Sequence, residues 1–258
     1  MGENEPLKGF RWRGGIKKET SGIMMWPEPF LVSQPNGDKI SILLVDTQGS
    51  FDGESTNKIF TAIFAISTMI SSIQIYNLAQ NIQENDLQNL QMFLEYSKIG
   101  VETEDGPPFQ KLVYLIRDWS SPYEANFGFE GGATLLKKKL EVKPEQPQEL
   151  QSIRKDLKTS FKSVDCFLMT HPGFEASEKV TFEGRLSEIR SEFKNCLKEF
   201  IPALLSAEKL ECKKTNGSDL KVSHLPQLLK NYVEILNSSS VSEATTIFEV
   251  IKIKLIQS

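Results

Sequence analysis

Short apolar runs rich in β-branched residues recur along this chain, and helical segments separate most of them. The runs span residues 23–32, 40–45, 73–76, 112–116 and 164–169. Apolar side chains at helical spacing occupy residues 59–72, 86–100, 149–161 and 184–205. Strands that alternate with helices build a mostly parallel sheet with right-handed crossovers and helices on both faces. The sequence therefore predicts a three-layer α/β fold.

The first two runs are expected to pair differently from the others. Asn36 and Gly37 lie between them, and an Asn-Gly pair between two apolar runs is a strong signal for a tight hairpin turn. The first pair of strands is therefore predicted to be antiparallel.

Composition excludes several classes of protein. The chain has 258 residues, of which 39% are hydrophobic and 25% are charged, and its formal net charge is −4. This is a globular composition, and its slight acidity gives no general attraction to nucleic acid. The three cysteines lack C-x-x-C spacing, which argues against a zinc site or a disulfide framework. Residues 59–83 are uncharged, but their polar second half favours a helix followed by a short buried strand over a membrane span.

The pattern changes after Leu205. Residues 206–223 are polar and are predicted to form a linker, residues 225–236 a short amphipathic helix, and residues 243–256 one more helix or strand. Lys137 to Lys139 are interpreted as the exposed end of a helix, where cations interact favourably with the helix dipole.

Candidate functional residues follow the apolar runs, because ligands of open α/β sheets bind beyond the carboxyl ends of the strands. The second run ends in Asp46-Thr-Gln-Gly49, the fourth in Arg117-Asp118-Trp119 and the fifth in Thr170-His-Pro-Gly173. A strand ending in D-x-x-G is typical of GTPases, in which the Asp acts on Mg²⁺ and the Gly lets its N–H approach the γ-phosphate. A surface turn with Asp and Gly has the same pattern, so this tetrapeptide alone does not decide between the two.

Several longer blocks in a fixed order carry a family resemblance. They are Gly9-Phe-Arg-Trp-Arg-Gly-Gly15, Glu19-Thr-Ser-Gly-Ile23, Asp46-Thr-Gln-Gly-Ser-Phe-Asp52, the helix and strand from Phe64 to Leu78, and Arg117-Asp-Trp-Ser120. Over about residues 5–232 the chain resembles the GTPase domain of the atlastins, dynamin-like membrane-fusion GTPases related to the guanylate-binding proteins. The resemblance implies a P-loop GTPase-like fold.

The resemblance also implies roles for individual residues. Thr20 and Asp46 would bind Mg²⁺, and Thr20 and Gly49 would act in catalysis, with Gly49 sensing the γ-phosphate. The nucleotide would be bound by Asp46, Gln48, Gly49, Arg117, Asp118, His171 and Pro172. Arg117 and Asp118 match the base-recognition motif, and the loop of His171 and Pro172 would cap the base. His171 is interpreted as a residue that rigidifies this loop, and Trp119 as an anchor of its own loop.

One expected motif is not in the sequence. A phosphate-binding loop has the pattern G-x-x-x-x-G-K-[ST], and these 258 residues contain no such octapeptide. In the family this loop, the first strand and an arginine finger lie upstream of the Gly9 block. We therefore expect residues 1–212 to form a GTPase domain that is incomplete at its N-terminus and lacks the first strand and the phosphate loop. Residues 213–258 are expected to form a linker and the start of a helical region.

Two functions remain open at this stage. The first is GTP binding and hydrolysis with Mg²⁺, coupled to homodimerisation and to membrane fusion at the cytosolic face of the endoplasmic reticulum, by a cytoplasmic chain without a membrane-spanning segment. The second is a catalytically inactive pseudo-GTPase that acts as a nucleotide-independent dimerisation module. The missing phosphate loop favours the second for the isolated polypeptide, whereas the resemblance implies the first.

Overall fold

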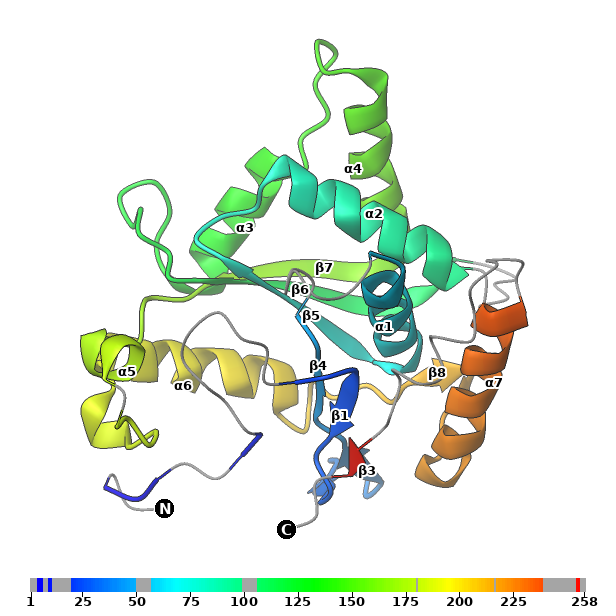
Figure 1. Ribbon diagram of the computed structural model, residues 1–258, viewed down its shortest axis with the longest axis horizontal. Coiled ribbons are helices and arrows are strands. Elements are labelled where there is room, and N and C mark those ends of the chain that lie inside the picture. Colours follow the sequence, from blue (N-terminus) through cyan, green and yellow to red (C-terminus); the bar gives the residue numbers. More distant parts are fainter. Residues whose placement is uncertain are drawn as a thin grey trace.

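The computed structural model describes residues 4–6, 9–10, 20–49, 57–98, 106–179, 181–215, 217–238 and 254–255 (Figure 1). A parallel sheet of three strands lies at its centre, in the order β5 (Ile73–Ala79), β6 (Phe109–Arg117) and β7 (Phe161–Leu168). Tyr76 pairs with Tyr114, which in turn pairs with Cys166. These strands coincide with the last three predicted runs, apart from Met169, which follows β7, and the prediction of a parallel α/β sheet is confirmed.

Helices cover both faces of this sheet (Figure 1). One face packs against α1 (Asn57–Ile70), α2 (Glu84–Lys98), α3 (Gly128–Lys139) and α4 (Gln148–Ser160) and forms the larger apolar core. Val113 and Phe167 point to the opposite face, where they pack with Phe200 of α6 (Ser191–Leu205). The three-layer arrangement follows from strands whose alternate side chains enter two separate cores.

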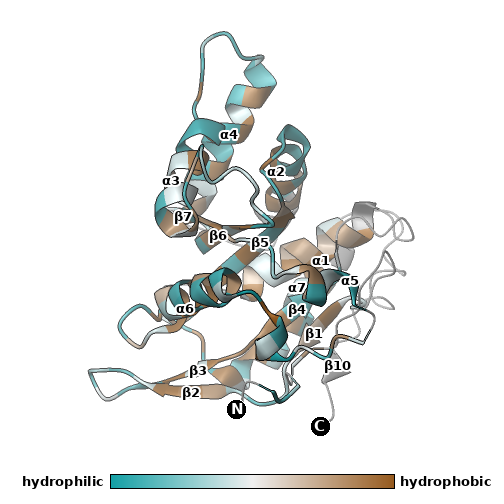
Figure 2. Cartoon of the chain, turned by 90° about the vertical axis from the view of Figure 1, so that its left-hand side faces the viewer, coloured by the Kyte–Doolittle hydropathy of each residue, from teal (hydrophilic) through white to brown (hydrophobic). Residues whose placement is uncertain are grey.

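The early apolar runs form a second, antiparallel part of the fold. β1 (Ile23–Met25) pairs with β4 (Val45–Thr47), and β2 (Phe30–Ser33) pairs with β3 (Lys39–Ile42). The β2–β3 hairpin projects from the body of the molecule, with apolar strands and a hydrophilic turn (Figure 2). Gly37 has a φ of 91° in this turn. The predicted antiparallel hairpin is thus confirmed.

Two of the predicted runs were too long. Residues 23–32 contain Pro27 and Pro29, which lack a backbone N–H, so the run divides into β1 and β2. Residues 40–45 divide at Leu43 and Leu44 into β3 and β4. Among the described residues, β4 pairs only with β1 and β5 pairs only with β6, so one edge of each carries no strand.

The predicted helix over residues 184–205 is also shorter than expected. Gly184 has a φ of 79°, and the following residues form a 3₁₀ turn, η1 (Leu186–Glu188), before α6 begins. The left-handed conformation at Gly184 is incompatible with a continuing α-helix. The amphipathic spacing therefore extends across two separate elements. The described segment before them also contains a short helix, α5 (Phe174–Glu178).

The predicted linker contains ordered elements that attach it to the sheet. These are β8 (Lys214–Thr215), β9 (Ser218–Asp219) and η2 (Val222–His224), and α7 (Leu225–Ser238) follows and packs against α1. The Gln110 side chain donates to the carbonyl of Cys212 at 2.9 Å and accepts from the N–H of Lys214 at 2.8 Å. Most of the predicted element at 243–256 lies outside the described residues, apart from β10 (Lys254–Leu255), which pairs with β1. None of the described helices combines the length and the apolar character needed to cross a bilayer.

A buried phenol in the central sheet gives a first testable prediction. Tyr114 is fully buried, and among the described residues its hydroxyl has no hydrogen-bond partner. Because an unpaired buried hydroxyl is costly, we expect Tyr114→Phe to raise the free energy of unfolding by about 1–2 kcal/mol. Urea unfolding measures this change, with Tyr76→Phe as the control, since the Tyr76 hydroxyl donates to the Asp86 carbonyl at 3.4 Å. A Tyr114→Phe variant less stable than the wild type would contradict the prediction.

Candidate functional site

The carboxyl ends of the three parallel strands are joined by backbone hydrogen bonds. Gln80, which follows β5, donates its N–H to the carbonyl of Arg117 at 2.7 Å. Trp119, which follows β6, donates to the carbonyl of Met169 at 3.0 Å, and Met169 donates to Ile116 at 2.8 Å. These bonds bring the segment of Arg117 and Asp118 next to the loop that carries His171 and Pro172. The structure therefore brings four of the predicted site residues to one edge of the sheet, where ligands of such folds bind.

Two residues at this edge have unusual backbone conformations. Asp118 has a φ of 58° and Gln80 a φ of 62°, and they are the only non-glycine residues with positive φ among those described. A left-handed conformation away from glycine is uncommon and costs about 1–3 kcal/mol, although Asp tolerates it better than most residues. Such outliers concentrate at functional sites, so their position side by side at two adjacent strand ends supports the placement of a site here.

The side chains of Arg117 and Asp118 lie close to each other without a tight ion pair. Arg117 Nε donates to Oδ1 of Asn77 at 2.6 Å, whereas its NH1 lies 3.9 Å from Oδ2 of Asp118. The Arg117 side chain is 47% exposed and that of Asp118 is 29% exposed. Sequence reasoning missed Asn77. The available signal was an Asn at the end of a predicted strand, next to the strand that carries Arg117.

The neighbouring loops are held by specific contacts. The buried Trp119 ring donates its Nε1–H to the carbonyl of Ala125 at 2.8 Å, which confirms its predicted role as a loop anchor. His171 Nδ1 accepts the N–H of Gly173 at 3.0 Å, and the carbonyl of Pro172 accepts the N–H of Arg190 at 2.9 Å. His171 therefore rigidifies its loop, as the sequence predicted, because its ring nitrogen is used by the backbone.

Thr20, Asp46, Gln48 and Gly49 form a second group on the antiparallel sheet. The Thr20 hydroxyl donates to Oδ2 of Asp46, which lies in β4. Gly22 and Gln48 are joined twice, since the N–H of Gly22 donates to Oε1 of Gln48 at 3.0 Å and the N–H of Gln48 donates to the carbonyl of Gly22 at 2.8 Å. Thr20 and Gln48 are buried, whereas Gly49 is exposed. These bonds hold the segment around Thr20 against the end of β4.

The oxygen atoms of this second group fit part of a magnesium site. A hydroxyl and a carboxylate are hard oxygen ligands of the kind that Mg²⁺ prefers, and Mg²⁺ commonly takes only one or two protein ligands besides water and phosphate oxygens. In the part of the chain that the structure describes, no three His, Cys, Asp or Glu side chains gather as a complete protein-built metal site would require. Thr20 and Asp46 therefore suit a metal ion that arrives with a phosphate ligand.

Comparison with known proteins adds independent information. A family model described as "Guanylate-binding protein, N-terminal domain" matches residues 3–214. Atlastin of Drosophila melanogaster is 47% identical over 242 residues, which cover 94% of this chain and 45% of that protein. Atlastin-1 of Macaca fascicularis is 49% identical, covering 90% and 42%, and Atlastin-2 of Homo sapiens is 48% identical, covering 91% and 40%. The chain thus spans less than half the length of these relatives.

Proposed function

Because the chain belongs to the family of guanylate-binding protein N-terminal domains, as an atlastin-like G domain of the dynamin superfamily, we propose that it binds guanine nucleotides at the carboxyl edge of the central sheet. The observation that carries the proposal is the position of Asp118. Its carboxylate follows β6 directly, its backbone is left-handed, and among the described residues it accepts no hydrogen bond. A carboxylate so held is available to a ligand.

Guanine matches such a carboxylate. Its N1–H and its exocyclic amine can donate to the two carboxylate oxygens, whereas adenine has no N–H at position 1 and no amine at position 2. Binding of adenine would leave a desolvated carboxylate unpaired, and this cost rejects the wrong base. Arg117 would lie beside the base, and the loop of His171 and Pro172 would cover it.

Thr20, Asp46, Gln48 and Gly49 are proposed to serve the phosphate end of the same nucleotide. Thr20 and Asp46 would hold Mg²⁺, which when bound neutralises charge on the phosphate oxygens. Gln48 holds the segment of Thr20 to the end of β4 through its bonds with Gly22. Gly49 is exposed, and no protein atom among the described residues lies within 4 Å of the position that a Cβ would occupy there. That open space is compatible with close approach of a phosphate group.

Hydrolysis of GTP is the finer part of the proposal. The 258 residues contain no G-x-x-x-x-G-K-[ST] octapeptide, so we expect the polypeptide alone to bind through the base more than through the phosphates and to hydrolyse GTP slowly at most. Membrane fusion at the cytosolic face of the endoplasmic reticulum, which the resemblance implies, belongs to the same proposal for the whole protein.

A second candidate function is a dimerisation module that does not need nucleotide. Tyr123 is 83% exposed in the loop that follows β6, and Phe174 is 75% exposed at the first residue of α5, in the segment that follows β7. Large exposed aromatic side chains are enriched at protein interfaces. This observation favours association of two copies through the edge that also carries the candidate nucleotide site.

A competition titration tests the proposal. The polypeptide is incubated with a fluorescent GDP analogue and Mg²⁺, and unlabelled GDP or ADP displaces it. We expect GDP to compete at least about 100-fold better than ADP, since two hydrogen bonds to a charged acceptor distinguish the bases. Equal competition by GDP and ADP would overturn the proposal. A polypeptide that binds neither nucleotide but forms a dimer in light scattering would instead support the second candidate.

A further inference from the structure

A polar side chain on the exposed face of β5 has no evident role in the fold. Asn77 lies between Ile75 and Ala79, which face the same side of the strand, and all three are exposed. Asn is depleted in strands, because its amide competes for backbone hydrogen bonds. Its position here coincides with a contact to the candidate site.

That contact is short and involves a charged donor. Arg117 Nε lies 2.6 Å from Oδ1 of Asn77, just below the usual range of about 2.7–3.2 Å for N–H···O bonds. The backbone of the same segment adds a second link, because Gln80 donates its N–H to the carbonyl of Arg117 at 2.7 Å. The end of β5 therefore holds both the main chain and the side chain of Arg117.

The hydrogen bond to Asn77 limits how closely the Arg117 guanidinium can pair with Asp118. An Arg and a carboxylate in adjacent positions can close into a bidentate pair, which occupies both carboxylate oxygens. In this structure the Nε–H points to Asn77, and NH1 stays 3.9 Å from Oδ2 of Asp118. The Asp118 oxygens therefore stay accessible to a ligand.

We propose that Asn77 is a positioning residue, which fixes the Arg117 guanidinium and so keeps the Asp118 carboxylate open for a guanine base. This inference rests on the proposed function, because it concerns the same site. Asn77 itself touches Arg117 and acts on Asp118 only through it. Without the amide oxygen, Arg117 turns toward Asp118 and closes the bidentate pair.

Three variants separate positioning from structure. Asn77→Leu keeps the approximate size of the side chain and removes the acceptor, whereas Asn77→Asp keeps an acceptor in the same place. Asn231→Leu is the matched control. Asn231 is also exposed and accepts a side-chain hydrogen bond, from Gln227, but it lies on α7 and contributes no residue to the candidate site. We expect all three to unfold within a few degrees of the wild type, since exposed hydrogen bonds contribute little to stability.

The first readout needs no nucleotide. In ¹H–¹⁵N spectra the Nε–H of Arg117, assigned with the Arg117→Lys variant, is expected to exchange slowly with solvent in the wild type, in Asn77→Asp and in the Asn231→Leu control. It is expected to exchange faster or to shift in Asn77→Leu. The second readout is the ratio of GDP to ADP affinity in the competition assay. Asn77→Leu is expected to lower this ratio by about 10-fold or more, and Asn77→Asp to keep it within about 3-fold of the wild type.

The outcomes distinguish this inference from the function on which it rests. A wild type that does not prefer GDP refutes the proposed function, and the inference falls with it. A wild type that prefers GDP together with an Asn77→Leu variant that keeps the full preference refutes the inference alone. Loss of preference in Asn77→Leu and retention in Asn77→Asp, without loss of thermal stability, supports it.

Discussion

The Gly132→Ala variant is expected to unfold about 6–12 °C below the wild-type protein, although alanine forms helices better than glycine does. Gly132 lies on the face of α3 that packs against β7. An ideal Cβ at this position would lie 1.9 Å from the carbonyl oxygen of Cys166 and 2.4 Å from its carbonyl carbon. Because these are backbone atoms of β7, no side-chain rotation relieves the clash.

The expected size follows from two opposing terms. Helix propensity favours Ala over Gly by about 1 kcal/mol. Overpacking costs about 1–3 kcal/mol and occasionally more, and we expect about 4 kcal/mol here because the clash is with backbone atoms that cannot rotate away. We expect a net loss of about 3 kcal/mol, which corresponds to about 6–12 °C for a chain of this length.

Thermal unfolding followed by circular dichroism measures this loss. Thr134→Ala in the same helix is the control, because Thr134 is exposed and its replacement tests helix propensity without a clash. The control is expected to keep or slightly raise the unfolding temperature. If Gly132→Ala were as stable as Thr134→Ala, the result would contradict the close contact between α3 and the backbone of β7 at this position.

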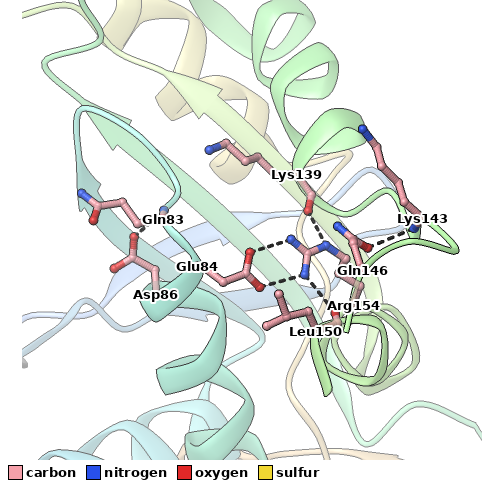
Figure 3. A network of polar contacts seen from close by, with 8 residues as sticks. All are labelled: Gln83, Glu84, Asp86, Lys139, Lys143, Gln146, Leu150 and Arg154. Atoms are coloured by element: carbon pink, nitrogen blue, oxygen red, sulfur yellow. Dashed lines mark hydrogen bonds and ion pairs between the residues drawn. The ribbon is translucent and has the colours of Figure 1, made fainter. Parts of the chain in front are cut away.

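Removal of Glu84 is expected to be the second large perturbation, because it leaves a buried guanidinium without its counter-charge. The Arg154 side chain is only 6% exposed, and its NH1 and NH2 donate to the two carboxylate oxygens of Glu84 at 2.8 and 2.7 Å (Figure 3). Nε also donates to the carbonyl of Lys139 at 2.9 Å. The pair therefore joins α2, the end of α3 and α4 at one point.

The two partners are not equivalent. Loss of one member of a buried pair costs about 3–5 kcal/mol when the other charge stays buried. Glu84→Ala leaves the buried Arg154 unpaired, so we expect a loss of about 3 kcal/mol. Arg154→Met leaves Glu84, which is 39% exposed and can be hydrated, and is expected to cost less. The double variant is expected to be more stable than the sum of the single losses predicts, because the two residues are coupled.

Acid unfolding checks the same pair. The hydrogen bond from Arg154 lowers the pKa of Glu84 below its ordinary value of 4.5. A carboxylate with a lowered pKa stabilises the fold above the unfolded-state pKa, and this contribution is lost as pH falls through the lower folded-state value. We therefore measure the free energy of unfolding in urea from about pH 6 to about pH 3, and we expect it to fall less in Arg154→Met than in the wild type. An equal pH dependence of the unfolding free energy in both proteins would contradict the conclusion that Arg154 lowers the pKa of Glu84.

The parallel sheet could be predicted because its signals are local. The apolar runs at 73–76 and 112–116 lie inside β5 and β6, and the run at 164–169 exceeds the end of β7 by one residue. The helical spacing at 59–72 and 86–100 matches α1 and α2 within a few residues. The errors in element boundaries occur at prolines and glycines, which interrupt a strand or a helix without changing the pattern of apolar residues. Pro27 and Pro29 divided one run, and the left-handed Gly184 separated η1 from α6.

Contacts between distant segments could not be predicted in this way. The family resemblance singled out Arg117 and Asp118, but Asn77 contacts Arg117 only because β5 and β6 lie side by side in register. Arg154 meets Glu84 across 70 residues, and Gly132 is critical only because α3 packs on Cys166. Each of these contacts involves a residue that is distant in the sequence, so the spacing of apolar residues does not predict it. The family resemblance therefore singled out the candidate residues, while the contacts around them could be found only in the structure.

A single substitution at Asp118, the residue proposed to recognise the base, tests the central claim most directly. Xanthine carries a carbonyl oxygen where guanine carries its exocyclic amine, so an acceptor-only carboxylate at position 118 suits guanine, whereas an amide that can also donate suits xanthine. Competition of GDP and xanthosine diphosphate against a fluorescent analogue of each is measured for the wild type and for Asp118→Asn. We predict that the wild type prefers GDP by about 100-fold or more and that Asp118→Asn prefers xanthosine diphosphate. A variant whose preference for GDP is unchanged would contradict the assignment of Asp118 as the residue that reads the base.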